Sequence, residues 1–451
     1  MTLRLASYGM RGFVGVSMTP RVVMDYAAAF GSYLNGGRVL VARDTRDSSP
    51  MLHAATLASL AGCGCEVLDL GVCPTPVAQF AVGLYEAAGA IAISGGHHGM
   101  GWNAITLVGS DGALLEPEGG ESVLDVFHAG DFLRRETPML GSARETADYI
   151  APYMKALGET VDTAAIRAAN LTVLIDPLAG AGCAFLEEFA SVLGFRLVAI
   201  NAQPSGYLPR EAEPRPRSAQ HLASFIRHVK GDAGFVLNSD MSRMSLVTDE
   251  GEPISEELTL PLIANHVLAR TPGIVVTNIC TTRTLDEVAA HHGCDVSKSA
   301  VGQAYVVAGV KNELAVIGGE GSGSMVLPSF TKAFDGFLMM ALVLEAMAKS
   351  AVSLGELLRR LPRFHIVKRR IPCEARRAYP VLDQLTRESD EWREGGEVST
   401  LDGIRVDWET GWLHVRASHT EQVIRVISED QEKEKAQQRA EQMVRRITEL
   451  L

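Results

Sequence analysis

Several features that would narrow the function are scarce or absent in this sequence of 451 residues. No stretch approaches the roughly 18 uninterrupted apolar residues of a membrane-spanning helix, and the first residues lack the long apolar region of a signal peptide. The seven cysteines are an odd number scattered among apolar neighbours, which is typical of reduced thiols in the cytosol. Cys63 and Cys65 have neither redox nor zinc spacing. We therefore expect a cytoplasmic protein that has no disulfide framework and does not bind membranes.

Positive charge is also scarce. The chain has 42 Lys and Arg residues against 54 Asp and Glu, so its formal net charge is -12. A polyanion would be repelled unless a basic patch were concentrated locally, and the densest basic stretch, residues 359–370, is interrupted by apolar residues. We expect no nucleic-acid partner.

Strand-like and helix-like segments alternate through most of the chain, and 47% of the residues are hydrophobic. The strand-like segments are 39–42, 67–70, 171–175, 196–200, 274–277 and 314–317. Helix-like segments lie between or after them at 51–61, 75–87, 186–193 and 284–291. Strands that alternate with helices of this length predict parallel, doubly wound sheets.

The chain is too long for a single core, and the pattern repeats in three similar blocks. The last ninety or so residues differ, because 406–408 and 412–416 alternate as in a hairpin and an amphipathic helix follows. The sequence predicts an α/β protein with three doubly wound mixed-sheet domains and a C-terminal α+β domain around a central cleft. The expected domains are residues 1–145, 146–252, 253–362 and 363–451.

Three polar loops, two of them rich in glycine, each follow an apolar strand-like run. Residues 94–99 read SGGHHG and come directly after the apolar run 89–93. Residues 238–243 read NSDMSR after a strand, and residues 318–323 read GGEGSG. Open α/β sheets bind ligands at the carboxyl ends of their strands, so these loops are candidate binding sites.

The three loops, with two further segments, resemble motifs of the α-D-phosphohexomutases, the superfamily of phosphoglucomutase, phosphomannomutase and phosphoglucosamine mutase. Residues 43–50, RDTRDSSP, resemble the Gly-Arg-Asp-Thr-Arg-x-Ser segment of that family, although by residue type alone they predict a helix cap with surface ion pairs. Residues 416–425 resemble its phosphate loop, Arg-x-Ser-Gly-Thr-Glu-Pro-x-x-Arg. The motifs follow the family's order along nearly the whole chain, and they imply a hexose phosphate ligand.

The resemblance also shows where the transfer chemistry has changed. Gly96 stands where the family's Thr-Ala-Ser-His-Asn-Pro loop has the serine that carries the phosphoryl group. Val14 replaces an arginine in the segment 8–15, and Thr106 replaces a lysine near the reacting phosphate. A covalent route through a serine is closed at this position.

The metal loop differs as well. The family's Asp-Gly-Asp-Ala-Asp-Arg holds Mg²⁺ with three carboxylates, whereas here Asp240 is the one acidic residue, flanked by Asn238 and Ser242. A hard cation is held best by charged oxygens. We therefore expect that no cofactor is needed and that Asp240 holds Mg²⁺ weakly or not at all.

The binding residues are better retained, and the resemblance implies their functions. Glu320 and Ser322 stand at positions that contact sugar hydroxyls, and glycines beside them would let the backbone approach the ring. The residues expected to bind the phosphate, or to lie near it, are Arg416, Ser418, Thr420, Arg425, Arg43 and Arg243.

Three functions remain open. The chain can be a hexose-phosphate-binding relative that has lost mutase chemistry, with the loop amides of residues 95–97 cradling a phosphate. It can be an active, metal-independent phosphosugar mutase or isomerase in which His97, His98 or Ser94 accepts the phosphoryl group or transfers protons. It can also be a scaffold or regulator for an enzyme of a sugar-nucleotide pathway.

Overall fold

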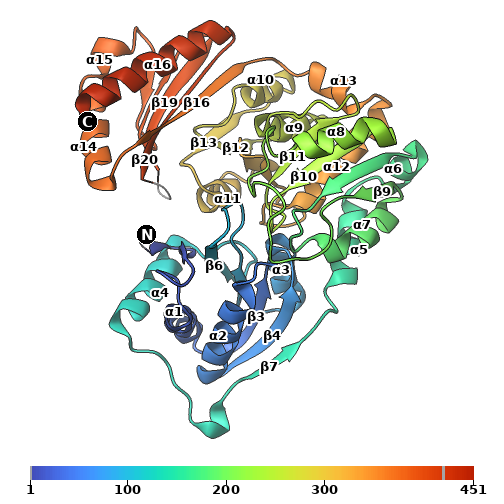
Figure 1. The fold of residues 1–451 in the computed structure, drawn as a ribbon, viewed down its shortest axis with the longest axis vertical. Coiled ribbons are helices and arrows are strands. Elements are labelled where there is room, and N and C mark those ends of the chain that lie inside the picture. The colour runs from blue at the N-terminus through green and yellow to red at the C-terminus, as the bar shows by residue number, and fades with distance from the viewer. Residues whose placement is uncertain (1–2, 419–421) are drawn as a thin grey trace.

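The computed structural model describes residues 3–418 and 422–451, so Thr420 of the expected phosphate loop lies outside the described residues. The chain builds four sheets in succession, which follow one another in Figure 1 from the blue sheet, through green and yellow, to the red one. Among the described residues, no helix is both long enough and apolar enough to span a membrane.

The first sheet has seven strands in the order β1-β2-β6-β5-β3-β4-β7. Its strands are β1 (Arg4–Ala6), β2 (Gly9–Phe13), β3 (Gly37–Arg43), β4 (Cys65–Val72), β5 (Gly89–Ile93), β6 (Trp102–Gly109) and β7 (Ser142–Glu145). Its helices are α1 (Pro20–Tyr33), α2 (Ser49–Gly62), α3 (Thr75–Leu84), α4 (Pro117–Ala129) and the short η1 (Thr137–Met139). Strands β3, β4, β5 and β7 run parallel, whereas β6 pairs antiparallel with β5 and β2.

Strand β3 shows why this sheet is covered on both faces. Side chains alternate across a strand, and Val39 and Val41 pack into one apolar cluster with Leu52 of α2. Leu40 and Ala42 point the other way, into a second cluster. A strand that is buried on both sides needs helices on both sides, and this is the doubly wound arrangement.

The second and third sheets each have four strands, in the orders β11-β10-β8-β9 and β13-β12-β14-β15. The second comprises β8 (Thr172–Asp176), β9 (Arg196–Ala199), β10 (Ala233–Leu237) and β11 (Met244–Thr248), with α5 (Ile150–Thr160), α6 (Thr163–Ala169), η2 (Cys183–Phe185), α7 (Leu186–Leu193) and α8 (Gln220–Val229). The third comprises β12 (Val275–Asn278), β13 (Val296–Ser299), β14 (Ile317–Glu320) and β15 (Ser324–Val326), with η3 (Glu256–Leu258), α9 (Thr259–Leu268), α10 (Thr284–His291), α11 (Gln303–Asn312), α12 (Gly336–Ser350) and α13 (Leu354–Arg359). Each sheet has one antiparallel edge strand.

The fourth sheet is antiparallel throughout, in the order β16-β20-β19-β18-β17. It comprises β16 (His365–Pro372), β17 (Glu397–Ser399), β18 (Ile404–Asp407), β19 (Gly411–Ala417) and β20 (Val423–Asp430), covered by α14 (Ala375–Arg387), α15 (Ser389–Trp392) and α16 (Lys433–Leu450). The predicted fold class, three mixed α/β sheets and a C-terminal α+β unit, is confirmed. The strand expected at 314–317 begins only at Ile317, because 303–312 is helical and the chain turns before the strand.

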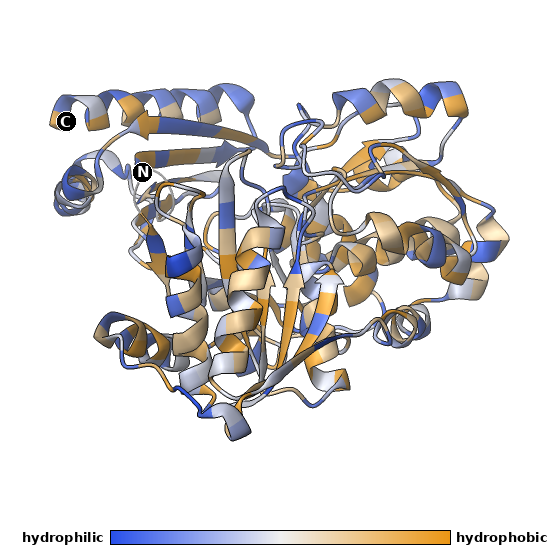
Figure 2. Cartoon of the chain, turned by 60° about the horizontal axis from the view of Figure 1, so that its bottom comes forward, coloured by the Kyte–Doolittle hydropathy of each residue, from blue (hydrophilic) through white to orange (hydrophobic). Residues whose placement is uncertain are grey.

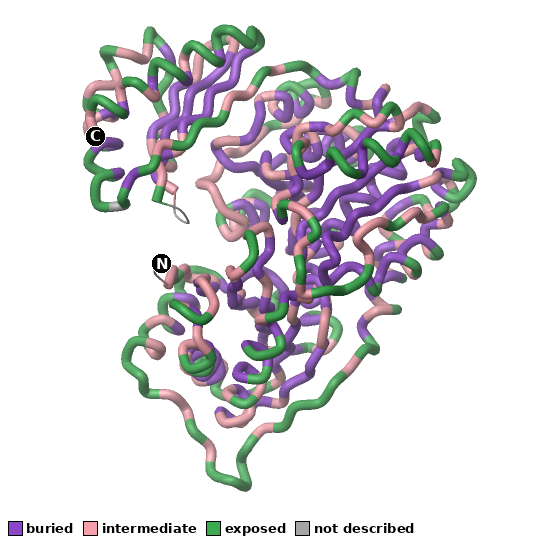
Figure 3. The backbone as a smooth tube through the Cα atoms, in the orientation of Figure 1, coloured by how far each residue is buried: buried purple, intermediate pink, exposed green. Residues whose placement is uncertain are grey.

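The described apolar residues form five clusters, of which the largest joins the first three sheets and one belongs to the fourth sheet alone. The largest cluster extends from Leu40 in the first sheet to Leu361 after the third, and it includes nearly all of α12. The fourth sheet has its own cluster, with Leu385, Val415 and Ile447 at its centre. In Figure 2 the strands of the first sheet are mainly hydrophobic and α16 is mainly hydrophilic. Figure 3 shows that the segment around β7, which links the first sheet to the second, is largely exposed.

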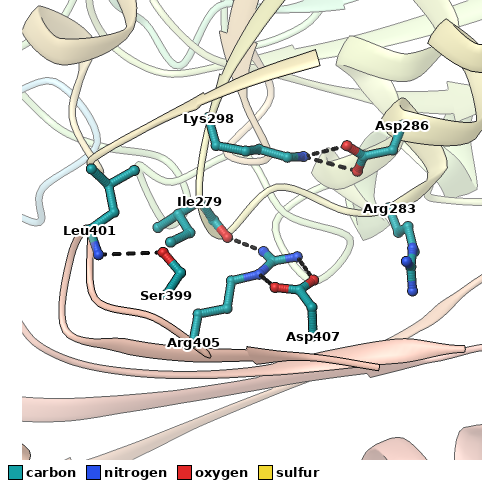
Figure 4. Close-up of a pocket in the computed structure, with 8 residues that line it drawn as sticks. All are labelled: Ile279, Arg283, Asp286, Lys298, Ser399, Leu401, Arg405 and Asp407. Atoms are coloured by element: carbon teal, nitrogen blue, oxygen red, sulfur yellow. Dashed lines mark hydrogen bonds and ion pairs between the residues drawn. The ribbon is translucent and has the colours of Figure 1, made fainter. Parts of the chain in front are cut away.

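The contacts between the third and fourth sheets are polar. Lys368 Nζ of β16 lies 2.9 Å from Glu256 Oε1 and 2.8 Å from Glu257 Oε1. Arg283 Nη1 donates to the Trp408 carbonyl at 2.7 Å. A pocket of about 220 Å³ opens between the two sheets, and Figure 4 shows its lining. The lining residues are Ile279, Arg283, Asp286, Lys298, Ser399, Leu401, Arg405 and Asp407.

Candidate functional site

The parallel pairing of β3 with β5 brings two of the predicted loops together. Arg43 and Ile93, the last residues of these strands, are register partners. The chain continues from each into a loop, and the Asp44 amide donates to the Ile93 carbonyl at 2.8 Å. The segments 43–50 and 94–99 therefore form one loop cluster at the carboxyl edge of the sheet.

Asp44 and Arg46 are the structural centre of this cluster, with side-chain exposures of 1% and 4%. Arg46 Nε lies 3.2 Å from Asp44 Oδ2, and Arg46 also donates to the carbonyls of His98 at 2.5 Å and Gly99 at 2.8 Å. Asp44 Oδ2 accepts from the Gly95 amide at 3.0 Å. Residue type alone predicted surface ion pairs in this segment. That prediction is wrong for Asp44 and Arg46, because their ion pair is buried and holds the loop in place. Only the long-range fold supplies these partners.

Gly96 lies where the loop approaches the second sheet. Its φ is +54°, the left-handed region that favours glycine. A Cβ at this position would lie 3.2 Å from Asp240 Oδ2, and the Gly96 carbonyl accepts from Ser239 Oγ at 2.9 Å. The glycine loop and the NSDMSR loop, about 140 residues apart in sequence, are therefore in direct contact.

Two of the three candidate phosphoryl acceptors are held by hydrogen bonds. Ser94 Oγ donates to Asp44 Oδ2 at 2.9 Å and accepts from the Gly96 amide at 3.0 Å. His98 Nε2 lies 2.9 Å from Arg11 Nη1. An arginine can only donate, so this nitrogen accepts and its lone pair is occupied. Burial, and then the charges of Arg11 and Arg243, lower the pKa of His98 to about 3.

His97 is in a different state. No described residue forms a hydrogen bond with its ring, which lies 4.2 Å from the His98 ring between centroids. Burial lowers the pKa of His97 well below its usual value, and the charges of Arg243, Arg11 and Arg425 lower it further. His97 is therefore a neutral imidazole near three guanidinium groups. Because the Gly95 and Gly96 amides are used within the loop cluster, side chains must supply most of the contacts to an anion here.

The NSDMSR loop follows β10 and is folded on itself. Asp240 Oδ1 accepts from the Ser242 hydroxyl at 2.7 Å and from its amide at 3.1 Å. Asn238 Oδ1 accepts from the amides of Ser242 at 2.9 Å and Arg243 at 3.0 Å. Burial raises the pKa of Asp240, and the bonds from Ser242 oppose that shift. Within residues 3–418 and 422–451, no group of three or more His, Cys, Asp or Glu side chains could hold a metal ion.

The sugar loop of the prediction lies at the end of β14, where Glu320 is 5% exposed. Its Oε1 accepts from Asn278 Nδ2 and from the Gly302 amide, both at 2.8 Å, and Ser322 Oγ is 3.4 Å from Oε2. Glu320 thus has structural partners that its sequence context did not indicate. Gly321 is required by packing, because a Cβ there would lie 1.9 Å from Glu257 Oε2.

The predicted phosphate residues of the fourth sheet lie at the ends of β19 and β20. Arg416 and Arg425 are register partners across these strands, and antiparallel partners share a face of the sheet. Arg416 is 4% exposed, and its Nε lies 3.1 Å from Asp402 Oδ2. The Ser418 amide donates to the Val423 carbonyl at 2.9 Å. The charge of Arg425 also lowers the pKa of His97 in the glycine loop of the first sheet.

Two more arginines belong to the first sheet. Arg43 donates to the Asp44 carbonyl at 3.2 Å, and its charge acts on Asp69 of β4. Arg11, to which the sequence assigned no function, lies beside His98. It stands in the motif-like segment 8–15, but register and long-range packing were needed to show its contact.

Fold and site together define a multi-domain α/β protein whose polar loops gather arginine side chains around a glycine loop. Four family descriptions match consecutive parts of the chain: phosphoglucomutase/phosphomannomutase alpha/beta/alpha domain I at residues 4–134, domain II at 151–251, domain III at 256–364 and the C-terminal domain at 370–446. The chain belongs to the phosphoglucomutase/phosphomannomutase family of the α-D-phosphohexomutase superfamily.

Relatives support this membership over the full length. A phosphoglucomutase/phosphomannomutase of Thermococcus kodakarensis is 31% identical, covering 99% of this chain and 98% of its own. A probable phosphoglucosamine mutase of Pyrococcus abyssi is 32% identical, with coverages of 97% and 96%. The fold matches a solved phosphoglucomutase/phosphomannomutase family protein of Burkholderia thailandensis with a TM-score of 0.87 at 24% identity, covering 99% and 98% of the two chains.

The expectation that no cofactor is needed is wrong. The relatives are phosphoglucomutases and phosphoglucosamine mutases, a family that normally uses Mg²⁺. The NSDMSR loop offers only oxygen donors: the Asp240 carboxylate, Asn238 Oδ1 and Ser242 Oγ. Mg²⁺ commonly binds through one or two carboxylates and keeps waters and substrate phosphate oxygens as its other ligands. The donor set therefore fits this ion when phosphate is present.

Proposed function

We propose that this phosphohexomutase-family chain binds a hexose phosphate and does not carry the transferred phosphoryl group on a serine. The observation that carries the proposal is Gly96, a residue without a hydroxyl, where the glycine loop meets Asp240. The neighbouring charges support the ligand class, because Arg11, Arg243 and Arg425 all act on His97. A phosphate ester is the anion that such a group of guanidinium donors binds well.

Each predicted residue has a function in this proposal. Glu320 would accept from sugar hydroxyls, mainly through Oε2, because Oε1 is already shared by two donors. Arg416, Ser418, Thr420 and Arg425 would hold the phosphate that does not react. Asp240, with Asn238 and Ser242, would hold Mg²⁺, which when bound offsets negative charge on a phosphoryl group. Arg243 would face the phosphoryl group near this Mg²⁺. Its Nη1 also lies 3.1 Å from Glu213 Oε1, so its charge is partly shared.

One observation favours a second candidate, an active phosphosugar mutase or isomerase that uses His97. Ser94 donates its hydroxyl to Asp44, and the Nε2 lone pair of His98 is taken by Arg11. His97 keeps a ring without hydrogen bonds to described residues, and a neutral imidazole can accept a phosphoryl group or a proton. Of the three acceptors considered from sequence, His97 is the one to test.

We also propose the four domains 1–145, 146–252, 253–362 and 363–451. Each sheet falls within one of these segments, and this supports the division.

Phosphorus NMR of the protein with hexose 1-phosphates and 6-phosphates tests the proposal. Each sample contains Mg²⁺ and a trace of the hexose 1,6-bisphosphate. Line broadening without interconversion is expected for a hexose-phosphate-binding protein without serine chemistry. Interconversion that His97→Asn abolishes would favour the second candidate, and no broadening with any hexose phosphate would contradict the proposal.

Gly96→Ser is expected to leave mutase turnover more than about 100-fold below that of the Thermococcus kodakarensis relative. The new hydroxyl would enter a site in which Thr106 of β6, and Asn238 and Ser242 of the loop after β10, still lack the charges of the family motif. A left-handed φ costs a non-glycine residue about 1–2 kcal/mol. Gly96→Ala has the same strain without a hydroxyl and is the control. Turnover within about tenfold of the relative would show that the serine alone was missing.

Arg416→Ala is expected to weaken hexose phosphate binding by about tenfold or more, because a charge-assisted contact is lost. Calorimetric titration measures the affinity. Arg369→Ala removes an exposed arginine from strand β16 of the same sheet and should leave affinity unchanged. A melting temperature recorded for each variant separates lost binding from the loss of the Asp402 ion pair. Unchanged affinity in folded Arg416→Ala would contradict the phosphate site.

A further inference from the structure

Arg11 lies on the same face of the first sheet as Thr106, the position where the family resemblance implies a lysine that this chain lacks. In the antiparallel pair β2–β6, Gly9 is opposite Thr106 and Arg11 is opposite Ala104. Opposite residues share a face, and a diagonal neighbour on that face is about 7–8 Å away. An arginine side chain is long enough to span that step. Arg11 can therefore bring a guanidinium group to the region that a lysine at residue 106 would serve.

The side chain of Arg11 is held in one orientation by His98. The Nη1–Nε2 distance is 2.9 Å, and because arginine donates, the His98 proton lies on Nδ1. The His98 ring is itself packed between neighbours, with centroids 4.2 Å from His97 and 5.9 Å from Trp102. A guanidinium group that is fixed before binding loses less side-chain entropy when an anion arrives.

Arg11 differs from the neighbouring arginines in having no carboxylate partner among the described residues. Arg46 is paired with Asp44, and Arg243 with Glu213. Arg11 forms no ion pair with any described carboxylate, although Asp240 is close enough to influence its pKa, which burial lowers. The charge of Arg243 also lowers the pKa of Arg11, and an anion between the two guanidinium groups would oppose that shift.

We propose that Arg11 is a phosphate-binding residue that replaces the charges absent at Thr106 and Val14, and that His98 is the positioning residue that holds it. The ligand class is a phosphate monoester dianion, seated between Arg11 and Arg243 in front of Gly96. The inference rests on the proposed function, since the ester is that of the bound hexose phosphate. It accounts for the contact between Arg11 and His98, two residues far apart in the sequence.

Calorimetry with glucose 1-phosphate and phosphorus NMR with inorganic phosphate test the inference on the full chain. Arg11→Gln is expected to weaken both ligands by about 10- to 100-fold, the loss of one or two bonds to a charged group. Arg21→Gln, which removes an arginine that is 92% exposed on α1, should change neither. Inorganic phosphate makes no sugar contacts, so its loss reports on the anion site itself.

Two variants of His98 test whether this residue acts by holding the Arg11 side chain or only by stabilising the fold. His98→Phe keeps a ring but has no acceptor for Arg11, and it is expected to weaken both ligands by several fold. His98→Gln keeps an acceptor and should restore affinity to within about threefold of the wild type. A purely structural function would give the same affinity for both variants at equal melting temperature.

The outcomes distinguish the inference from the proposed function. If the wild type binds glucose 1-phosphate and folded Arg11→Gln binds it equally well, Arg11 is not a phosphate ligand and the inference is wrong. If the wild type binds neither probe, the proposed function itself fails. If Arg11→Gln does not fold, Arg11→Lys replaces it, because lysine keeps the charge but lacks the planar guanidinium group. Reduced affinity of Arg11→Lys for glucose 1-phosphate then supports the inference. Full affinity of Arg11→Lys, together with equal affinities of the two His98 variants, overturns it.

Discussion

Asp44→Ala is expected to lower the free energy of unfolding by about 3–5 kcal/mol, because it leaves the buried Arg46 guanidinium without its counter-charge. The same carboxylate accepts from the Ser49 hydroxyl, the Ser94 hydroxyl and the Gly95 amide. Removing it frees the strand-end loops of β3 and β5 from each other. Hexose phosphate binding should therefore fall as well, even at temperatures at which the chain stays folded.

Urea denaturation followed by circular dichroism measures the change in stability. Asp25→Ala is the matched control, because Asp25 forms an exposed helical pair with Arg21 at 3.9 Å and such pairs contribute roughly 0.5 kcal/mol or less. A loss below about 1 kcal/mol for Asp44→Ala would mean that Arg46 reaches water easily. That result would remove the proposed structural basis of the glycine loop.

Glu345→Gln is expected to have an effect of similar size near neutral pH, about 3 kcal/mol or more. Glu345 on α12 is fully buried. Its oxygens lie 2.7 Å from His266 Nε2 and 2.8 Å from Arg270 Nη1, and the Asp162 amide donates to it at 2.9 Å. It thereby joins three helical segments of the second and third sheets. A neutral amide keeps the shape but removes the charge that these donors share.

The stabilisation by Glu345 should depend on pH. Burial alone would raise the pKa of this carboxyl, but the hydrogen bonds from His266 and the Asp162 amide, with the charge of Arg270, lower it to about 2. A folded pKa below the unfolded value of about 4.3 means that the stabilisation is fully present above that value. It is lost as the pH falls toward about 2.

Denaturation curves of the wild type and Glu345→Gln, recorded at several pH values between 7 and 3, measure this dependence. The difference between the two proteins should be largest near neutral pH and shrink below the unfolded pKa. Glu159→Gln, at an exposed position on α5, provides the control. A difference that stays constant down to pH 3 would contradict the lowered pKa.

Local sequence patterns predicted much of the fold. The expected helices 186–193 and 284–291 coincide with α7 and α10, since apolar residues at helical spacing define them without long-range information. The loops after β5, β10 and β14 were also located, because short apolar runs followed by glycine and polar residues indicate where buried strands end. Such signals depend only on neighbours in the sequence.

The partners within the site could not be predicted in that way. Arg46 contacts the carbonyls of His98 and Gly99, more than fifty residues away, and Arg11 contacts His98 across 87 residues. No spacing rule connects such positions, and a buried ion pair has the same residue types as a surface pair. Even the glycines of the 318–323 loop, expected to admit a sugar, are explained by neighbours such as Glu257 that only the folded chain supplies.

Under the proposed function, the separate core of the fourth sheet would affect the rate at which a ligand leaves. Apolar packing joins the first three sheets, so moving one of them would expose core residues to water. The fourth sheet is joined to the third by ion pairs and hydrogen bonds, such as those of Lys368 and Arg283, which water can replace at little cost. Arg416 and Arg425, the proposed phosphate ligands, belong to this fourth sheet. Release of a phosphate from them would then need only rotation of that sheet with its helices, without partial unfolding of the rest.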